Sequence, residues 1–458
     1  MREINKIIVN KDLTIKETMR TIDRGAIKIA LVVDETDKLC GTVTDGDIRR
    51  GILNGIDIQD KISKVMNKNF VYSHVGASRE KLLDLIKNKH ITGLPLVDQN
   101  KNVKDFVLLS ESNEIYFFNT DPKIQKHIGR ILVIGGAGYI GSVLVRRLLD
   151  KGYKVRVLDF FVYGNTSLKD LENNPDLEIV EGDTRHIEVV ADAASDADAV
   201  VHLAELVGDP ACSINPKITQ NINYLATKLI ASVCKYYQIN RFIYTSSCSV
   251  YGASENNRLS SEESLLKPLS LYAKMKIEAE KALMEMMDGN FSPTILRLAT
   301  VFGFSHRPRF DLVVNLLTAK ALNEGKITIF GGDQWRPHVH VSDVAQAIIC
   351  VLEAPIEKVS GQVFNVGSND LNCTINQIGD MIHALLPESK IIKEGVDHDE
   401  RDYKVDFTKI KSILNYNPNK DLKYGIKEII DAFKNNKVKS NYSDDIYSNV
   451  KYLKNKLI

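Results

Sequence analysis

The stretch Arg130-Ile131-Leu132-Val133-Ile134-Gly135-Gly136-Ala137-Gly138-Tyr139-Ile140-Gly141 decides the fold of most of this chain. Its first five residues predict a short buried strand, its glycines predict a tight turn, and the apolar periodicity of residues 143–149 predicts a helix. Gly135 can enter the turn without a Cβ penalty, Gly138 lets the backbone approach a phosphate, and Gly141 lets the helix pack closely on the strand. The amino end of that helix would face the phosphates of a bound dinucleotide. The stretch therefore predicts the first unit of a doubly wound, parallel α/β sheet.

A second strand, predicted over residues 154–159, identifies the dinucleotide. It ends in Asp159, about 20 residues after the turn, where a carboxylate can accept hydrogen bonds from the hydroxyls of the adenine ribose. Phe160 and Phe161 follow, so neither Arg nor Lys stands directly after Asp159 to neutralise a 2′-phosphate. The pattern therefore favours NAD over NADP.

Tyr272 and Lys276 form the strongest catalytic pattern in the chain. Residues four apart share one face of a helix, so the Lys276 ammonium is expected close to the Tyr272 phenol. A nearby positive charge would lower the pKa of the phenol and make it a usable base near neutral pH. Tyr-x-x-x-Lys alone is a weak motif, and its weight here comes from the glycine turn and acidic strand end upstream.

Residues 130 to about 435 resemble the extended short-chain dehydrogenase/reductase family, in its branch of nucleotide-sugar epimerases and dehydratases. The family's Thr-Gly-x-x-Gly-x-x-Gly turn is matched by residues 134–141, with Ile134 in place of Thr. Its Ser-Ser-x-x-Val-Tyr-Gly run is matched by residues 246–252, which puts Ser247 at the catalytic Ser/Thr position. The resemblance implies a catalytic triad of Ser247, Tyr272 and Lys276.

The resemblance also implies a set of cofactor contacts. The family's Gly-Asp-x-x pattern is similar to residues 182–185, and its His-Leu-Ala-Ala run to residues 202–205. The residues implied to bind NAD are Gly135, Gly138, Tyr139, Ile140, Gly141, Asp159, Asp183, Thr184, Leu203, Ala204, Tyr272 and Lys276.

The implied reaction starts with oxidation of a nucleotide sugar. Tyr272 would take a proton from a sugar hydroxyl while hydride passes to NAD, with Ser247 hydrogen-bonded to the developing ketone. The 4,6-dehydratases carry an Asp-Glu pair directly after the catalytic Ser or Thr, whereas this chain has Cys248 and Ser249. We therefore expect epimerisation, with C4 as the expected carbon. A reductase, a dehydratase that uses Glu205, a decarboxylase and an NAD sensor without turnover remain as alternatives.

Substrate contacts are implied at several positions. Residues 331–344 resemble the family's Arg-x-x-x-His-Val-x-Asp-Val segment, where Arg336 would bind the diphosphate bidentately. Thr300 stands where the family often has Asn, and Glu205 where it usually has Ala. Glu205 is either an extra base or a salt-bridged or solvated side chain, and Cys248 is expected to be passive. The implied substrate-binding set is Glu205, Cys248, Ser249, Thr300, Arg309, Arg336 and Arg401.

The first 118 residues contain an internal repeat of about 60 residues, in which each half has a strand ending in Val-Asp followed by another strand. The repeat resembles a CBS domain pair. The resemblance implies one adenine-nucleotide site at Thr44 and Asp47, and Leu108 and Glu111 hold the equivalent, degraded positions. A ligand-free dimerisation module is the alternative. Residues 44–50, Thr-Asp-Gly-Asp-Ile-Arg-Arg, also resemble a run in CBS pairs that are fused to sugar-phosphate nucleotidyltransferases. This resemblance suggests a role in polysaccharide biosynthesis.

These readings divide the chain into four parts. Residues 1–118 are the CBS pair, 119–129 a linker, 130–435 the dehydrogenase/reductase domain and 436–458 a tail that forms a helix or stays loose. The expected fold class is α/β: a Rossmann-type sheet with a smaller C-terminal substrate-binding part, preceded by an α+β CBS pair.

Composition narrows the partners. Sixty basic and 59 acidic residues argue against a general affinity for nucleic acid or an anionic membrane. The chain has neither a signal-peptide core nor an apolar run of about 18 residues, so we expect a cytoplasmic protein. The six scattered cysteines indicate reduced thiols, and His338 and His340 lack a third metal ligand. Helix pairing predicts a homodimer, which CBS association could double to a homotetramer.

Overall fold

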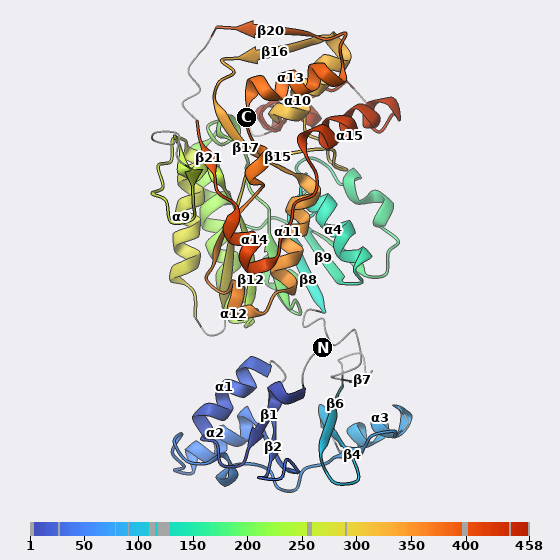
Figure 1. The fold of residues 1–458 in the computed structure, drawn as a ribbon, viewed down its shortest axis with the longest axis vertical. Helices are drawn as coiled ribbons and strands as arrows, with labels where there is room; N and C mark the ends of the chain where they lie inside the picture. Colours follow the sequence, from blue (N-terminus) through green and yellow to red (C-terminus); the bar gives the residue numbers. More distant parts are fainter. Residues whose placement is uncertain are drawn as a thin grey trace. The chain divides into compact units, whose positions relative to one another are not determined.

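The computed structural model describes residues 4–25, 28–77, 79–89, 91–109, 115–117, 129–253, 259–288, 291–395, 402–438 and 441–456. The chain divides into two compact units, Met1–His127 and Ile128–Ile458. Each unit has hydrophobic clusters of its own, and each is considered by itself (Figure 1). The predicted linker, residues 119–129, lies almost wholly outside the described residues and stays a prediction.

The first unit repeats one arrangement twice. In each half a short strand pairs in parallel with a second strand, which then turns back into an antiparallel third. The turn between the last two strands is held by the Val-Asp acid: Asp34 accepts a hydrogen bond from the backbone of Thr36, and Asp98 from that of Asn100. The elements are β1 (Ile8–Asn10), α1 (Ile15–Gly25), β2 (Ile29–Val33), β3 (Leu39–Thr44), α2 (Asp45–Leu53), β4 (Ser73–His74), α3 (Arg79–Asn88), β5 (Gly93–Val97), β6 (Val103–Leu109) and β7 (Ile115–Phe117).

The two halves share a hydrophobic cluster. Leu31 and Leu39 of the first half pack with Val97 and Phe106 of the second, and all four are at most 4% exposed. Burial of this apolar area stabilises the two halves together, because neither half covers these side chains alone.

The second unit is built on a seven-stranded parallel sheet. The strand order is β10-β9-β8-β11-β12-β14-β18, so the chain reverses direction across the sheet between β8 and β11. Ligands of doubly wound sheets bind outside the carboxyl ends of the strands at this reversal. The strands are β8 (Arg130–Ile134), β9 (Lys154–Asp159), β10 (Leu177–Glu181), β11 (Ala199–His202), β12 (Arg241–Ser247), β14 (Ser292–Leu298) and β18 (Val363–Val366). The predicted fold class is confirmed.

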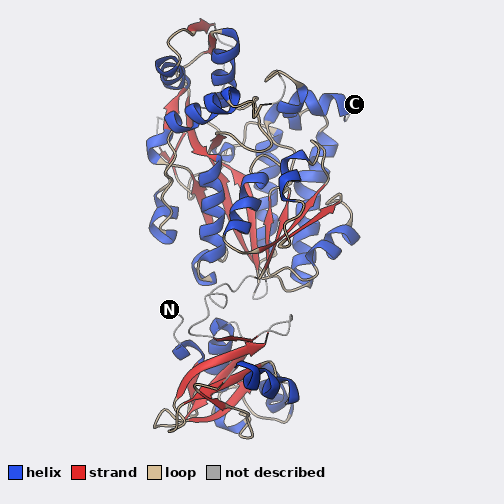
Figure 2. Ribbon diagram, turned by 90° about the vertical axis from the view of Figure 1, so that its right-hand side faces the viewer, coloured by secondary structure: helices blue, strands red, loops and turns tan. Residues whose placement is uncertain are grey.

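Helices cover both faces of this sheet (Figure 2). Successive side chains of β8 point to opposite faces. Ile131 and Val133 therefore pack with α4 (Gly141–Asp150) and α11 (Val341–Glu353). Leu132 and Ile134 pack with α5 (Ile187–Ala194), α8 (Ala226–Tyr236) and α9 (Leu271–Glu285).

The smaller C-terminal part is a separate cluster of short strands and helices. Its core includes Phe302, Ile327, Ile378 and Ile426, all fully buried. Its elements are β15 (Thr300–Phe302), α10 (Val313–Glu324), β16 (Lys326–Phe330), β17 (Trp335–His340), β19 (Asn372–Thr374), α13 (Ile375–Leu385), β20 (Lys390–Glu394) and α15 (Leu422–Lys434). Four further short elements border the main sheet, where Val359, Val405 and Ile410 join its core: β13 (Leu259–Ser260), α12 (Ile356–Val359), β21 (Lys404–Val405) and α14 (Thr408–Leu414).

The tail ends in a helix, α16 (Asn449–Lys456). Leu453 is 1% exposed and packs in a cluster with Leu206, Cys212 and Tyr272. The Tyr452 ring lies 5.3 Å from the Tyr163 ring, centroid to centroid. Of the two alternatives for the tail, the structure therefore has the helix, and this helix returns to the Rossmann part of its own unit.

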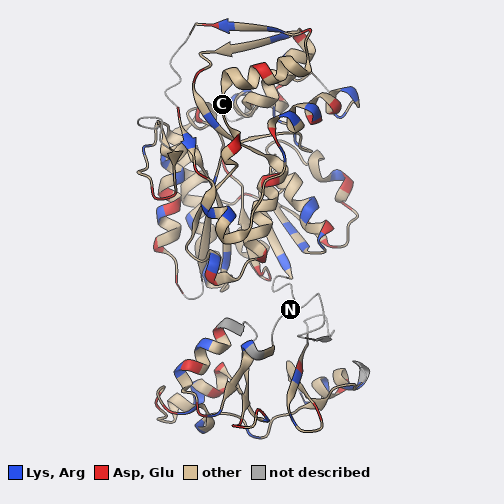
Figure 3. Cartoon of the chain, in the orientation of Figure 1, with Lys and Arg blue, Asp and Glu red and all other residues tan. Residues whose placement is uncertain are grey.

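Charged side chains of both signs are interspersed along the helices and strands of each unit (Figure 3). Within the described residues, no helix combines the length and apolarity needed to cross a membrane.

Candidate active site

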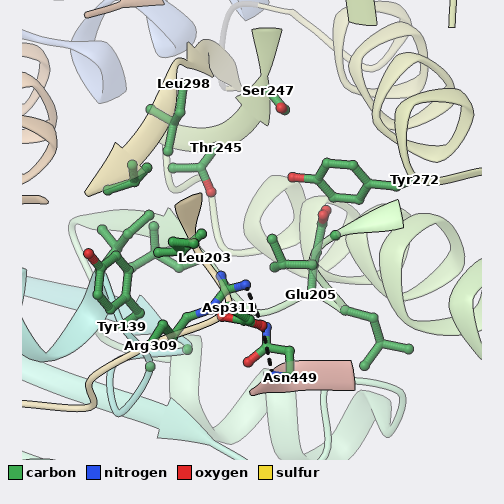
Figure 4. Close-up of a pocket in the computed structure, with 18 of the residues that line it drawn as sticks. Tyr139, Leu203, Glu205, Thr245, Ser247, Tyr272, Leu298, Arg309, Asp311 and Asn449 are labelled. Carbon is green, nitrogen blue, oxygen red and sulfur yellow. Dashed lines mark hydrogen bonds and ion pairs between the residues drawn. The ribbon is translucent and has the colours of Figure 1, made fainter. Parts of the chain in front are cut away.

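A cavity of about 850 Å³ lies at the carboxyl ends of the central strands (Figure 4). This volume is within the usual range for small-molecule sites. Its walls come from the glycine turn, the ends of β9, β11 and β12, the start of α9, the C-terminal part and α16. The cavity therefore lies where the sheet reverses, as the topology requires.

Two glycines of the turn, Gly135 and Gly141, have no room for a side chain. Gly135 has φ +88°, and a Cβ there would lie 2.7 Å from the backbone nitrogen of Ala204. A Cβ on Gly141 would lie 2.2 Å from the carbonyl oxygen of Gly135, where α4 begins. The backbone of the turn is thus exposed to the cavity beside the amino end of α4, which suits a dinucleotide diphosphate.

Asp159 is fixed at the end of β9. Its two carboxylate oxygens accept hydrogen bonds from the backbone of Ala137 and of Phe161, both at 2.9 Å. Burial raises the pKa of Asp159, and these hydrogen bonds oppose the rise. A carboxylate has about four acceptor positions, so Asp159 keeps acceptor capacity for ribose hydroxyls. The residues present therefore fit NAD.

Other predicted cofactor residues line the same cavity. Leu203 and Ala204 face the glycine turn, with the Leu203 backbone bonded to Ile134 at 2.8 Å. Burial alone would raise the pKa of Asp183, but its ion pair with Arg185 lowers it. The predicted residues Gly138, Tyr139, Ile140 and Thr184 also border the cavity.

The Tyr139 hydroxyl is committed to protein contacts. It donates to the carbonyl oxygen of Gly303 at 2.6 Å and accepts from the Asn315 amide at 3.2 Å. The hydroxyl proton of Tyr139 is therefore not available to a ligand. The tyrosine ties the glycine turn to the C-terminal part.

Ser247, Tyr272 and Lys276 meet in this cavity. Ser270 caps α9, since its hydroxyl accepts from the backbone of Ala273 at 3.2 Å. The first turn of α9 then carries Tyr272, and the next carries Lys276, whose ammonium lies 5.7 Å from the centre of the Tyr272 ring. Ser247 ends β12, and Figure 4 shows its hydroxyl and that of Tyr272 directed into the cavity.

The expected lowering of the Tyr272 pKa is wrong for the groups the protein supplies. Burial raises the pKa of Tyr272 well above its usual value, and the negative charge of Glu205 raises it further. A hydrogen-bonding interaction with Ser247 works in the opposite direction but is weaker. The four-residue spacing placed Lys276 correctly, but it could not show that another residue compensates its charge.

That residue is Glu205, whose side chain is only 2% exposed. Its carboxylate forms an ion pair with Lys276 and accepts a hydrogen bond from the Tyr244 hydroxyl at 2.7 Å. Lys276 also donates to the carbonyl oxygen of Thr245 at 2.5 Å. Of the alternatives for Glu205, the structure has the salt bridge, and the solvated side chain is wrong.

Five of the predicted substrate residues line the cavity: Glu205, Ser249, Thr300, Arg309 and Arg336. Arg309 is paired with Asp311 through two contacts of 2.9 and 3.1 Å. Arg336 is 7% exposed and donates to the carbonyl oxygen of Trp335 at 2.8 Å. Arg401 lies outside the described residues.

Cys248 is wrongly placed in the substrate-binding set. It is 1% exposed, does not line the cavity, and its thiol lies 3.3 Å from the carbonyl oxygen of Arg297. Burial raises the pKa of this thiol well above its usual value, so it is a passive core side chain. Ser247 ends β12 at the cavity, and Cys248 begins the 3-10 helix that follows, with its side chain in the core.

The tail supplies pocket residues that sequence reasoning did not nominate. Asn449, Val450 and Leu453 line the cavity, and the Asn449 backbone donates to Asp311 at 2.9 Å. The apolar spacing of Val450 and Leu453 was the available signal. It indicated a helix with one apolar face but not the surface on which that face packs.

In the first unit, Thr44 and Asp47 lie together at the start of α2. The Thr44 backbone donates to the Asp47 carboxylate at 2.8 Å, and the Asp47 backbone donates to the Thr44 hydroxyl at 3.3 Å, which forms a capping box. Asp47 also pairs with Arg50 at 2.6 Å. Both side chains thus stabilise the helix start, and their predicted role in nucleotide binding stays a prediction.

His338 and His340 serve the packing of the C-terminal part. Nδ1 of His338 lies 3.3 Å from the carbonyl oxygen of Leu371, and Nε2 of His340 lies 2.9 Å from Glu428. In the part of the chain that the structure describes, no group of three or more His, Cys, Asp or Glu residues could hold a metal ion.

Two family models match the chain. The model of the NAD dependent epimerase/dehydratase family matches residues 131–367, and the CBS domain model matches residues 1–54 and 62–110. The chain belongs to the NAD dependent epimerase/dehydratase family and carries an amino-terminal pair of CBS domains. The predicted cofactor, NAD, and the predicted enzyme branch are confirmed.

Similar proteins carry out more than one reaction. A putative UDP-glucose 4-epimerase of Methanocaldococcus jannaschii is 32% identical over 316 residues, 67% of this chain and 99% of that protein. UDP-glucuronic acid decarboxylase 1 of Arabidopsis thaliana is 29% identical over 318 residues, 67% of this chain and 70% of that protein. A solved structure of UDP-glucuronic acid 4-epimerase from Bacillus cereus, in complex with UDP-glucuronic acid and NAD, has a TM-score of 0.61 at 26% identity, covering 67% of this chain and 99% of its own. Family membership therefore defines an enzyme that modifies nucleotide sugars, but not which reaction it performs.

Proposed function

We propose that this protein epimerises a nucleotide-diphosphate sugar with tightly bound NAD, through a transient ketosugar, and that the carbon is C4. The observation that carries the proposal is the meeting of Ser247 and Tyr272 in one cavity with the glycine turn, without a carboxylic acid at position 248 or 249. Similarity to a putative UDP-glucose 4-epimerase and to a UDP-glucuronic acid 4-epimerase supports it.

Each residue of the triad has a distinct task in this proposal. The Tyr272 oxygen accepts the proton of the sugar hydroxyl, and the Ser247 hydroxyl donates a hydrogen bond to the carbonyl oxygen that develops. NAD, when bound, accepts a hydride from the same carbon and later returns it. Lys276, whose ammonium lies 5.7 Å from the Tyr272 ring centre, would hold the cofactor ribose. Tyr272 returns its proton when the ketosugar is reduced on its other face.

The surroundings of Glu205 weigh against dehydration. Elimination of water from the sugar needs an acid and a base beside the reacting carbons. The Glu205 carboxylate is engaged by Lys276 and Tyr244, and Cys248 is turned into the core. Glu205, the one residue considered as a replacement for the missing acid pair, is thus held by protein groups, and no carboxylic acid follows Ser247.

We also infer that the CBS pair binds an adenine nucleotide at Thr44 and Asp47 and that this binding alters the activity or association of the enzyme. The match of both CBS modules supports a nucleotide-binding unit. A cytoplasmic location, a homodimeric or homotetrameric state and a role in polysaccharide biosynthesis stay predictions of the same proposal.

The proposal is tested with purified protein and no added cofactor. The protein is incubated with UDP-, GDP- and dTDP-sugars and with UDP-uronic acids, and each mixture is followed by proton NMR and mass spectrometry. We expect a new sugar of unchanged mass from one substrate, and no product with Tyr272→Phe. A loss of water or of carbon dioxide would assign the dehydratase or the decarboxylase instead, and no change with any sugar would contradict the epimerase.

A further inference from the structure

Glu205 is a charged side chain buried beside the catalytic residues. Its side chain and that of Lys276 are 2% and 4% exposed, and both border the catalytic cavity. Burial of an ion pair removes water from two charges, and this desolvation cost can exceed the attraction between them. The pair is therefore weak evidence for a role in the stability of the fold. A small apolar residue beside Tyr244 would avoid that cost.

We propose that Glu205 is a positioning residue of the catalytic site: its carboxylate holds the Lys276 ammonium and cancels the charge that Lys276 would otherwise present to the Tyr272 hydroxyl. The inference rests on the proposed function, in which Tyr272 is the base. It assigns Glu205 to the control of the base, and neither to substrate binding nor to proton transfer with the sugar.

The contacts of Lys276 define the arrangement. Its ammonium is held by the Glu205 carboxylate and by the Thr245 carbonyl, and it lies 4.7 Å from the centre of the Tyr244 ring. Tyr244 in turn fixes one Glu205 oxygen at 2.7 Å. In Figure 4 the Glu205 side chain extends toward the end of Tyr272 that carries the hydroxyl. One carboxylate thus lies close to both members of the pair.

The other groups around Tyr272 do not replace Glu205 in this role. On α6 (Asp209–Cys212), the Asp209 charge also raises the pKa of Tyr272, but less than the Glu205 charge does, which is the largest cause after burial. Burial raises the pKa of Cys212 to about 12, so its thiol is uncharged near neutral pH. From β11, burial and the charge of Lys276 lower the pKa of His202 to about 3, so this imidazole is neutral. The titratable or charged groups facing the cluster are His202 on β11, Asp209 and Cys212 on α6, Tyr244 on β12, and Lys276 and Glu280 on α9.

The sign of the effect follows from these charges. A negative charge disfavours the phenolate and raises the pKa of Tyr272, whereas a positive charge lowers it. Glutamine at position 205 keeps the shape and the acceptor oxygen but removes the negative charge. The Lys276 ammonium then has no carboxylate to compensate it, and the largest negative charge opposing the phenolate is gone. We therefore expect the pKa of Tyr272 to fall.

The experiment reads the ionisation of Tyr272 without depending on turnover. Protein labelled with 13C at the ring carbon bonded to the tyrosine hydroxyl is titrated by NMR, and Tyr272→Phe assigns the resonance. We expect Tyr272 in Glu205→Gln to ionise at a pH lower by about one unit or more than in the wild type. If the sugar panel identifies a substrate, the limb of the kcat/KM profile that reports the base shifts in the same direction and by the same amount.

Tyr244→Phe is the matched variant, because it alters the same wall but keeps the Glu205 charge. Its Tyr272 titration is expected to move much less than that of Glu205→Gln. An unmoved titration in Glu205→Gln, or equal shifts in both variants, would overturn the proposal. Loss of turnover in Glu205→Gln at every pH with an unmoved titration would instead make Glu205 an acid or base of the reaction. Absence of turnover in the wild type would contradict the proposed epimerase but leave the NMR result readable.

Discussion

Arg297 and Glu280 form a second buried ion pair, directly behind the catalytic strand. Both side chains are 6% exposed, and the guanidinium contacts the carboxylate at 2.7 and 3.1 Å. Arg297 also donates to the Tyr251 hydroxyl at 3.0 Å, and Ser246, the neighbour of Ser247, donates to Glu280. The pair thus joins β12, β14 and α9 next to the catalytic residues, and it fixes the position of α9 relative to β12.

Removal of one partner of this pair should be costly. We expect Glu280→Gln to lower the free energy of unfolding of the second unit by about 3–5 kcal/mol, because Arg297 would remain buried without a counter-charge. The only tryptophan of the chain, Trp335, lies in this unit, so its fluorescence follows the urea transition.

Glu278 provides a control on the same helix. Glu278 and its partner Lys281 are 48% and 63% exposed. Glu278→Gln should change the free energy of unfolding by less than about 1 kcal/mol, since exposed pairs contribute little. Equal losses in the two variants would contradict the role assigned to burial.

Sequence reasoning at this scale succeeded where the signal was local. The glycines of the turn, Asp159 and the Tyr272–Lys276 spacing are read from neighbouring residues, and the structure brings them to one cavity. The partner of Lys276 could not be read in this way. Glu205 and Lys276 are 71 positions apart in the chain, and only the pairing of β11 with β12 brings them together.

At the scale of elements, α16 is the least expected part of the active site. It begins at Asn449, whose backbone is bonded to Asp311, and one turn later Leu453 is buried against the cluster that contains Tyr272. A terminal helix of eight residues is marginal by itself, so its stability comes from this docking.

Leu453→Ala should therefore detach the helix from the cavity. Truncation of a buried leucine to alanine costs about 2–5 kcal/mol. A loss of only about 1.4 kcal/mol changes the equilibrium constant between the docked and the undocked helix tenfold. We expect the variant to lose bound NAD at least tenfold faster, measured as the NAD retained by the protein over time after gel filtration.

Lys454→Ala is the control, because Lys454 is exposed on the same helix. It should retain NAD as the wild type does. Loss of NAD at the same rate from both variants, or from neither, would show that α16 does not restrain the cofactor.

The tail also shows what the apolar pattern leaves out. Spacing at Val450 and Leu453 identifies an amphipathic helix, but any apolar surface of the protein could receive it. The aromatic contact between Tyr452 and Tyr163 and the bond to Asp311 select the surface, and both depend on the completed fold.

At the scale of the whole molecule, the chain contains a unit of the epimerase/dehydratase family and a CBS pair. Titration of the full-length protein with AMP, ADP and ATP by calorimetry should give saturable heat with at least one of them. Asp47→Asn should abolish this heat, because the predicted ribose contact is lost. Absence of heat with all three would remove adenine nucleotides as ligands of the pair.

Two controls accompany the titration. Asp47 also caps α2, so a thermal melt must show that Asp47→Asn stays folded. Asp57→Asn changes an exposed turn carboxylate in the same unit and should leave the heat unchanged.

The repeat of the first unit could be predicted from the sequence, since both halves end a strand in Val-Asp and turn back in the same way.

The docked helix α16 bears on whether bound NAD exchanges with free NAD. A cofactor enclosed by the chain itself and restored at the end of each epimerisation does not exchange with the free pool. Under the proposed function, the reaction would therefore proceed at the same rate under oxidising and under reducing conditions. The supply of sugars would then be independent of the ratio of NAD to NADH.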